Sequence, residues 1–207
     1  LLKIKLYRPF PYKEIEKKLE GKKVIVLDRA ISFGAYPPIF SDVKIALEYK
    51  LKEPRTHCYI STVGKALFLS KVIDLDNVGV TVDFGHALYC FESPAESIVV
   101  LNKWNKLFHV HFNDNYRDWD HDLIVGSVNF WDTLETVYWL RRIGYDRWIS
   151  LDIYPYREDV IKACEESINN LKLIEKIAEK FEDKIEKAIE KGDPTFTVSV
   201  LRELFKI

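Results

Sequence analysis

The stretch Val78-Gly79-Val80-Thr81-Val82-Asp83-Phe84-Gly85-His86 decides the fold class of this chain. A short apolar run at residues 78–83 ends in a carboxylate, and a polar loop follows it, which predicts a β-strand. Similar runs occur at residues 46–50, 107–112 and 148–153, and each precedes a longer amphipathic helical segment. Four such units predict an α/β fold with parallel strands and crossover helices over residues 46–207.

Capping residues mark where several helices begin and end. Ser93 directly precedes Pro94, and Glu96 follows Ser93 by three residues. This pattern predicts a helix that starts near residue 94. Asn129 and Asp132 do the same for a helix that ends before Gly144. Dense charge over residues 160–191 fits a long helix that Gly192-Asp193-Pro194 stops.

Residues 1–45 have a different pattern. An alternating segment at residues 2–6, a helical segment at 12–19 and an apolar run at 24–27 predict a short βαβ segment of a doubly wound sheet. We place the domain boundary between residues 45 and 46, where helix and strand patterns compete. The chain has no methionine, so we expect it to be a fragment.

Composition excludes several function classes. The 31 basic and 32 acidic residues nearly cancel and form no long block of one sign, which argues against nucleic acid or an anionic membrane as partner. No apolar run is long enough to cross a bilayer and no signal peptide is seen. Three cysteines without pair spacing suit reduced thiols, so we expect a cytoplasmic protein.

Each of the four predicted strands ends in a carboxylate or an imidazole: Glu48, Asp83, His111 and Asp152. The carboxyl ends of strands in a parallel barrel meet on one face, so these groups are expected to point into one site. Three carboxylates and an imidazole suit Mn²⁺, Co²⁺ or Mg²⁺ better than structural Zn²⁺. Taken singly, each acid could instead cap a helix or form a loop salt bridge.

Further candidates surround these strand ends. His86 follows Asp83 by three residues, and Gly85 would let the backbone turn tightly between them. His109 and His111 share one strand face, and one of them could be a hydrogen-bonded core histidine. Alternating acids over residues 118–122 would repel one another unless a cation neutralised them, although a solvated acidic turn explains them equally well.

These motifs, in this order, resemble L-rhamnose isomerases within the xylose isomerase-like barrel superfamily. They are Glu48-Tyr49-Lys50, Asp83-Phe84-Gly85-His86, His111-Phe112-Asn113-Asp114, Asp120 to Ser127, and Leu151-Asp152. The resemblance implies half of a TIM (β/α)8 barrel in which Glu48, Asp83, His111 and Asp152 hold one metal ion. It also implies that His86, Asp120 and Asp122 hold a second ion, and that Lys50 and His86 bind the sugar.

The implied reaction is aldose–ketose interconversion, with a divalent metal, most simply Mn²⁺, as Lewis acid. Lys50, Glu48 and Asp152 are the implied catalytic residues. The hydrogen could move as a hydride, or as a proton through an enediol with Glu48 or Asp152 as base.

Residues 1–45 resemble part of the alpha subunit of pyruvate:ferredoxin oxidoreductase, through residues 8–11, 26–29 and 31–35. We therefore expect a chimera of two α/β pieces. Two alternatives to a sugar isomerase stay open: a metal-binding but inert protein, and a fragment of the oxidoreductase subunit. An open half-barrel would also favour self-association through its sheet edges, giving a homo-oligomer.

Overall fold

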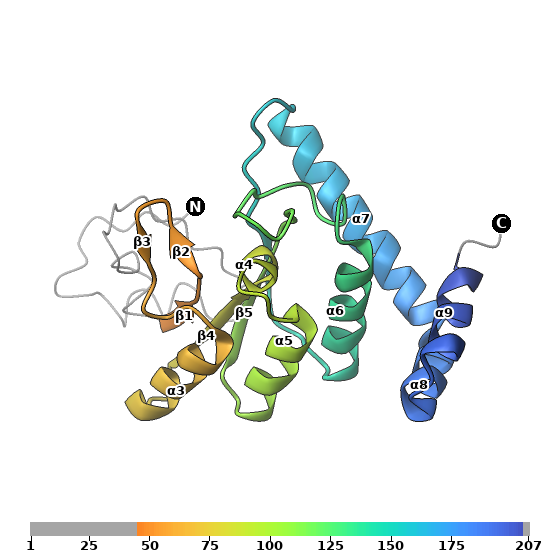
Figure 1. Ribbon diagram of the computed structural model, residues 1–207, viewed down its shortest axis with the longest axis horizontal. Coiled ribbons are helices and arrows are strands. Elements are labelled where there is room, and N and C mark those ends of the chain that lie inside the picture. Colours follow the sequence, from red (N-terminus) through yellow and green to blue (C-terminus); the bar gives the residue numbers. More distant parts are fainter. Residues whose placement is uncertain (1–44, 205–207) are drawn as a thin grey trace, which may run out of the picture.

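The computed structural model describes residues 45–204, and its centre is a parallel sheet of four strands (Figure 1). The strands are β1 (Ile45–Glu48), β4 (Val78–Asp83), β5 (Leu107–Phe112) and β6 (Ile149–Leu151), in the order β1-β4-β5-β6. Neighbours in the sheet are also successive parallel strands in the chain, as in a barrel wound in one direction. The prediction of parallel strand–helix units, half the number of a closed barrel, is confirmed.

Helices follow the strands and pack along the sheet and against one another (Figure 1). They are α3 (Val63–Ile73), α4 (Phe84–Tyr89), α5 (Pro94–Lys103), α6 (Phe130–Arg142), α7 (Val160–Lys180), α8 (Glu182–Lys191) and α9 (Pro194–Glu203). Ser93 caps α5 by accepting a hydrogen bond from the backbone N–H of Glu96, as predicted. Within residues 45–204, no helix is both long and apolar enough to span a bilayer.

The core lies between the sheet and these helices. Val80, Val82 and Val110 are fully buried, and the rings of Phe84 and Phe112 stack with centroids 5.6 Å apart. Further members come from the helices, among them Leu88, Ile98, Leu101, Leu134, Val137 and Ile174. All six residues of β4 are buried, so this strand fixes the middle of the sheet.

Several local predictions need correction. Two short strands, β2 (Lys52–Glu53) and β3 (Thr56–His57), form an antiparallel hairpin where no strand was predicted. The long helix predicted over 160–191 breaks at Phe181, and Asp193 caps α9 rather than only ending a helix. Asn129 stands at the start of α6, but its side chain makes no cap because it binds the preceding loop instead.

The predicted βαβ segment over residues 1–45 lies outside the described residues, apart from Ile45 itself. The strands predicted over 46–50 and 148–153 are present with shorter bounds, 45–48 and 149–151.

Candidate metal centre

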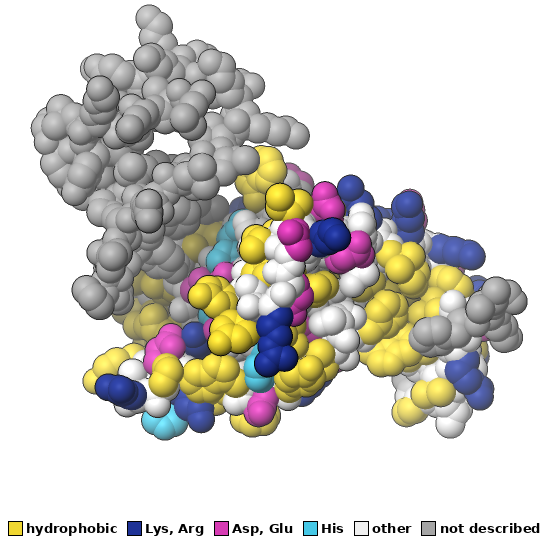
Figure 2. All heavy atoms as spheres, turned by 90° about the horizontal axis from the view of Figure 1, so that it is seen from above, with side chains coloured by type: hydrophobic (Ala, Val, Ile, Leu, Met, Phe, Trp, Pro, Cys, Tyr) yellow, Lys and Arg dark blue, Asp and Glu magenta, His cyan; other side chains and the backbone are white. Residues whose placement is uncertain are grey.

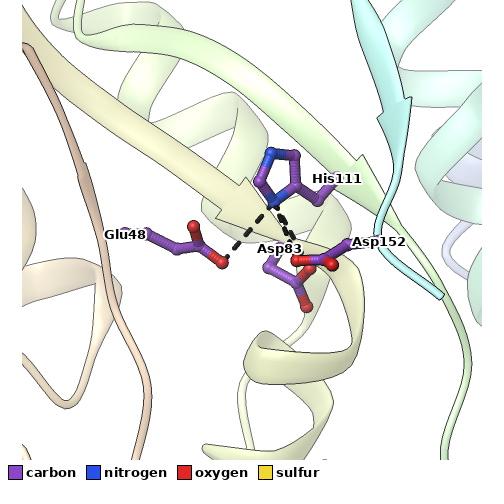
Figure 3. A group of neighbouring side chains, drawn as sticks. All are labelled: Glu48, Asp83, His111 and Asp152. Carbon is purple, nitrogen blue, oxygen red and sulfur yellow. Dashed lines mark ion pairs between the residues drawn. The ribbon is translucent and has the colours of Figure 1, made fainter. Parts of the chain in front are cut away.

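The structure brings Glu48, Asp83, His111 and Asp152 together at the carboxyl end of the sheet (Figure 3). Glu48 ends β1 and Asp83 ends β4, where it pairs in register with His111 of β5. Asp152 directly follows β6. One potential ligand atom from each of the four side chains lies within 4.8 Å of the other three.

The ring nitrogen Nδ1 of His111 is surrounded by carboxylate oxygens. It lies 3.5 Å from Oε1 of Glu48, 3.7 Å from Oδ2 of Asp83 and 3.4 Å from Oδ2 of Asp152 (Figure 3). This buried nitrogen makes no hydrogen bond of good geometry. A buried, unbonded nitrogen among three carboxylates is the arrangement that a divalent cation would complete, since oxygen and imidazole ligands together suit such ions.

Burial differs sharply within this group. The side chain of Asp83 is completely buried, whereas that of Asp152 is 54% exposed. Figure 2 looks down on the loops that follow the strands, and acidic and histidine side chains reach the surface there among apolar ones. The centre therefore opens toward solvent on the Asp152 side.

A second group shares Asp83 with the first and adds His86 and Asp120. Nδ1 of His86 lies 3.2 Å from Oε1 of Glu48, and its Nε2 lies 3.2 Å from Oδ2 of Asp120. The Lys50 ammonium forms an ion pair with the same Asp120 oxygen at 2.8 Å. This second group therefore already contains a fixed positive charge.

Asp122, which the resemblance assigns to the second ion, is not among the atoms of that compact group. Its Oδ1 lies 3.4 Å from the amide nitrogen of Asn113, and burial, together with the charges of Asp120 and Asp152, raises its pKa to about 7. The neighbouring Asp118 points outward with a side chain 77% exposed, 3.9 Å from Nε2 of His121. The acidic loop thus divides into inward and outward members.

The charges of the centre shift the pKa values of its histidines upward. Burial alone would lower the pKa of His111, but its contacts with Asp152 and Glu48 outweigh burial and raise that pKa to about 10. His86 behaves in the same way, and Asp83 and Asp120 raise its pKa to about 11. Burial raises the pKa of Asp83 to about 6 despite these cations. The acids thus create a strong demand for positive charge.

Asn113 supports the centre, and this role was missed from the sequence. Its amide nitrogen donates to both carboxylate oxygens of Asp83, at 3.1 and 2.9 Å. The backbone N–H of His86 donates to the same carboxylate at 2.8 Å. The signal was present in the run His-Phe-Asn-Asp, but the contact spans 30 residues and needs the tertiary fold.

Gly85 is needed for space rather than for a tight turn. It lies in α4 and is not among the described glycines with positive φ. A Cβ at this position would lie 2.1 Å from Oδ1 of Asn113 and 2.9 Å from Nδ2 of Asn115. Nδ2 of Asn115 donates to the Gly85 carbonyl at 2.7 Å, so α4 and the loop after β5 are in direct contact.

Asp114 fixes the loop after β5 and belongs to neither group of potential ligands. It is fully buried, and its carboxylate accepts hydrogen bonds from the backbone N–H groups of Val128 and Asn129, at 2.8 and 3.0 Å. The Asn129 side chain donates to it as well. These bonds anchor both ends of the loop that carries Asp120 and Asp122.

Two family models match the chain. The model for xylose isomerase-like TIM barrels matches residues 39–184, and that for the pyruvate:ferredoxin oxidoreductase core domain II matches residues 1–72. The two matches overlap over residues 39–72. Both resemblances inferred from the motifs are thereby confirmed at the level of the family.

Individual proteins are also similar to parts of the chain. Pyruvate synthase subunit PorA of Thermotoga maritima is 44% identical over 64 residues, which are 30% of this chain and 16% of that protein. An uncharacterized protein of Methanocaldococcus jannaschii is 38% identical over 121 residues, 56% of this chain and 40% of the relative. The xylose isomerase of Thermus thermophilus is 29% identical over 118 residues, covering 56% of this chain and 30% of that enzyme.

Solved structures give the same architecture. A D-tagatose 3-epimerase-like protein is 31% identical with a TM-score of 0.53, over 67% of this chain and 51% of that one. An L-ribulose 3-epimerase, at 15% identity and a TM-score of 0.57, shares the fold over 72% of this chain and 52% of its own. The chain thus spans less than half of the curated relatives and about half of these structures, and it belongs to the xylose isomerase-like TIM barrel family.

Proposed function

We propose that this chain binds a divalent metal ion through Glu48, Asp83, His111 and Asp152, as part of a sugar isomerase or epimerase. The observation that carries the proposal is the buried Nδ1 of His111, which lies among three carboxylates without a hydrogen bond. A xylose isomerase and a D-tagatose 3-epimerase-like protein among the relatives support a small sugar as substrate.

Mn²⁺ is the ion that we propose first, with Co²⁺ and Mg²⁺ as alternatives. Three carboxylates and one imidazole form a ligand set that is rich in oxygen, which suits these ions. When bound, such an ion acts as a Lewis acid that polarises the carbonyl and the adjacent hydroxyl of an open-chain sugar. The four side chains would hold it at the carboxyl end of the sheet. We propose that His86 and Asp120 of the second group bind a further cation together with Asp122.

The chain's own residues suggest how the sugar is handled. The Lys50 ammonium, oriented by Asp120 at 2.8 Å, would donate a hydrogen bond to a sugar oxygen, and His86 lies beside it. Asp83 is fully buried and held by Asn113, so it cannot reach a substrate. Asp152 is the more exposed acid and is therefore the first candidate for a base, with Glu48 second.

L-Rhamnose is the first substrate to test, because the motifs resemble L-rhamnose isomerases. NMR would follow its conversion to the ketose by the Mn²⁺-loaded chain in D₂O, with Asp152→Asn as the matched variant. Deuterium bonded to C1 of the ketose would indicate an enediol, and its absence a hydride shift. Mn²⁺ binding without turnover of any aldose would favour the inert metal-binding protein instead.

The arrangement of the whole chain is also a proposal. We propose that residues 1–45, which resemble the oxidoreductase subunit, are joined to residues 46–207 as a chimera. Association of copies through the edges of the sheet, and a cytoplasmic location, stay predictions.

A further inference from the structure

Two histidines lie side by side on β5, but only one belongs to the metal centre. The rings of His109 and His111 meet edge to face, with centroids 5.0 Å apart and planes at 86°. Nε2 of His109 lies 2.8 Å from Oγ of Ser150 on β6. Ser150 is in turn the register partner of His111 across the β5–β6 pair. The His109 ring is therefore held by Ser150 and packs against the ring of His111.

His111 needs such a support. Its Nδ1 faces the carboxylates of Glu48, Asp83 and Asp152, yet within residues 45–204 no hydrogen bond to its Nε2 is found. A metal-binding imidazole is usually oriented by a hydrogen bond to the nitrogen that does not bind the metal. Within residues 45–204, the ring of His109 is therefore the protein contact that can supply this orientation.

We propose that His109, held by Ser150, is a positioning residue that fixes the ring plane of His111 so that Nδ1 faces the three carboxylates. The inference rests on the proposed metal site, and it gives a role to His109, which is not one of the proposed ligands. An edge-to-face contact is a favoured geometry for ring pairs, so it selects one orientation of the ring. The hydrogen bond from β6 makes that contact rigid.

Calorimetric titration with Mn²⁺ tests this proposal on the full chain and on single variants. His109→Ala removes the ring and should weaken Mn²⁺ binding about tenfold, the lower end of what lost support of a ligand costs. His109→Phe keeps a ring at the same place and should recover most of that loss. Ser150→Ala removes only a hydroxyl and should weaken binding less than His109→Ala. His57→Ala removes an exposed histidine of β3 and should leave binding unchanged.

A second readout separates positioning from general damage to the fold. The visible absorption of Co²⁺ at the site reports ligand geometry, and it should change in His109→Ala but return toward the wild-type spectrum in His109→Phe. Metal-free melting temperatures provide the control for folding.

The outcomes are distinguishable. Wild-type chain that takes up no Mn²⁺ would overturn both the metal site and this inference. Wild-type binding with unchanged affinity and Co²⁺ spectrum in His109→Ala and Ser150→Ala would overturn the positioning role alone. Complete loss of binding in both His109 variants would overturn it as well, because His109 would then be a ligand.

Discussion

The two groups of potential ligands share Asp83 but differ in what balances their charge. In the first group, Glu48, Asp83 and Asp152 contact histidines, and no lysine or arginine within residues 45–204 forms an ion pair with them. In the second, the Lys50 ammonium already lies 2.8 Å from Asp120. The same kinds of residue therefore produce two sites with different needs. Within residues 45–204, the acids of the first group are paired with histidines alone, whereas Asp120 of the second is also paired with Lys50.

The largest expected effect is a loss of Mn²⁺ affinity, and it should differ between the histidines of the two groups. His111→Ala removes the one nitrogen ligand of the first group and should weaken binding of the first Mn²⁺ more than about 100-fold, a loss of roughly 2.7 kcal/mol. His86→Ala should weaken it less than about tenfold, because His86 contacts this group only through Glu48 and Asp83. Calorimetric titration measures both. The reverse order would place the tighter ion in the second group.

The next effect concerns stability. Acids this close repel one another by at least about 1 kcal/mol per pair, so an ion that binds only the folded chain should stabilise it. At a concentration one hundred times its dissociation constant, Mn²⁺ should add about 2.7 kcal/mol to the free energy of unfolding. Melting curves with Mn²⁺ and with a chelator measure this change.

Variants locate the source of that stabilisation. Asp83→Asn and Asp152→Asn should blunt the response to Mn²⁺, whereas Asp118→Asn, in the exposed part of the acidic loop, should not. A melting temperature that ignores both metal and chelator in the unmutated chain would mean that no ligand set is assembled.

A smaller effect tests the support of Asp83, the residue that the two groups share. Gly85→Ala would place a methyl group 2.1 Å from Oδ1 of Asn113, the residue that holds Asp83. Relief of this clash requires Asn113 or α4 to move, which should cost about 1–3 kcal/mol of stability. Gly64→Ala in α3 is the matched control, because its Cβ would meet no atom nearer than 4.0 Å. Urea denaturation compares the two, and equal effects would deny the close contact.

The sequence was sufficient to predict the four strands of the parallel sheet and to place the candidate ligands at their carboxyl ends. Asp83 is the last residue of β4 and His111 the last but one of β5, two strands of six residues that are long enough for a pattern to be read, and the parallel fold brings the two residues into register. The hairpin β2–β3 was missed because strands of two residues have no readable period. Asn113 was missed as a support of Asp83 because only the folded sheet brings them together.

Helix ends show the same division between local and tertiary information. Ser93 was a correct cap because its hydrogen bond reaches only to Glu96. Asn129 was assigned the wrong contact because buried Asp114, distant in the chain, offers its side chain an acceptor oxygen at 2.6 Å. Local chemistry can be read from sequence, but competition between local and distant partners cannot.

The smallest expected effect tests whether Lys50 occupies the place of a second ion. Its ammonium and a divalent cation would compete for the same Oδ2 of Asp120, and like charges a few ångströms apart repel. Lys50→Met removes the charge but keeps an unbranched side chain of similar length. It should tighten binding of a second Mn²⁺ about tenfold, or roughly 1.4 kcal/mol, while leaving the first nearly unchanged.

Lys52→Met is the matched control, since Lys52 lies near the Tyr89 ring rather than on an acid of the centre. Electron paramagnetic resonance of free Mn²⁺, combined with calorimetry, counts the bound ions in both variants. A second ion that binds equally well with and without Lys50 would show that the ammonium moves aside at no measurable cost. The two groups would then be equivalent in their demand for cations, and the residues that distinguish them would have to be sought in the ligands rather than in Lys50.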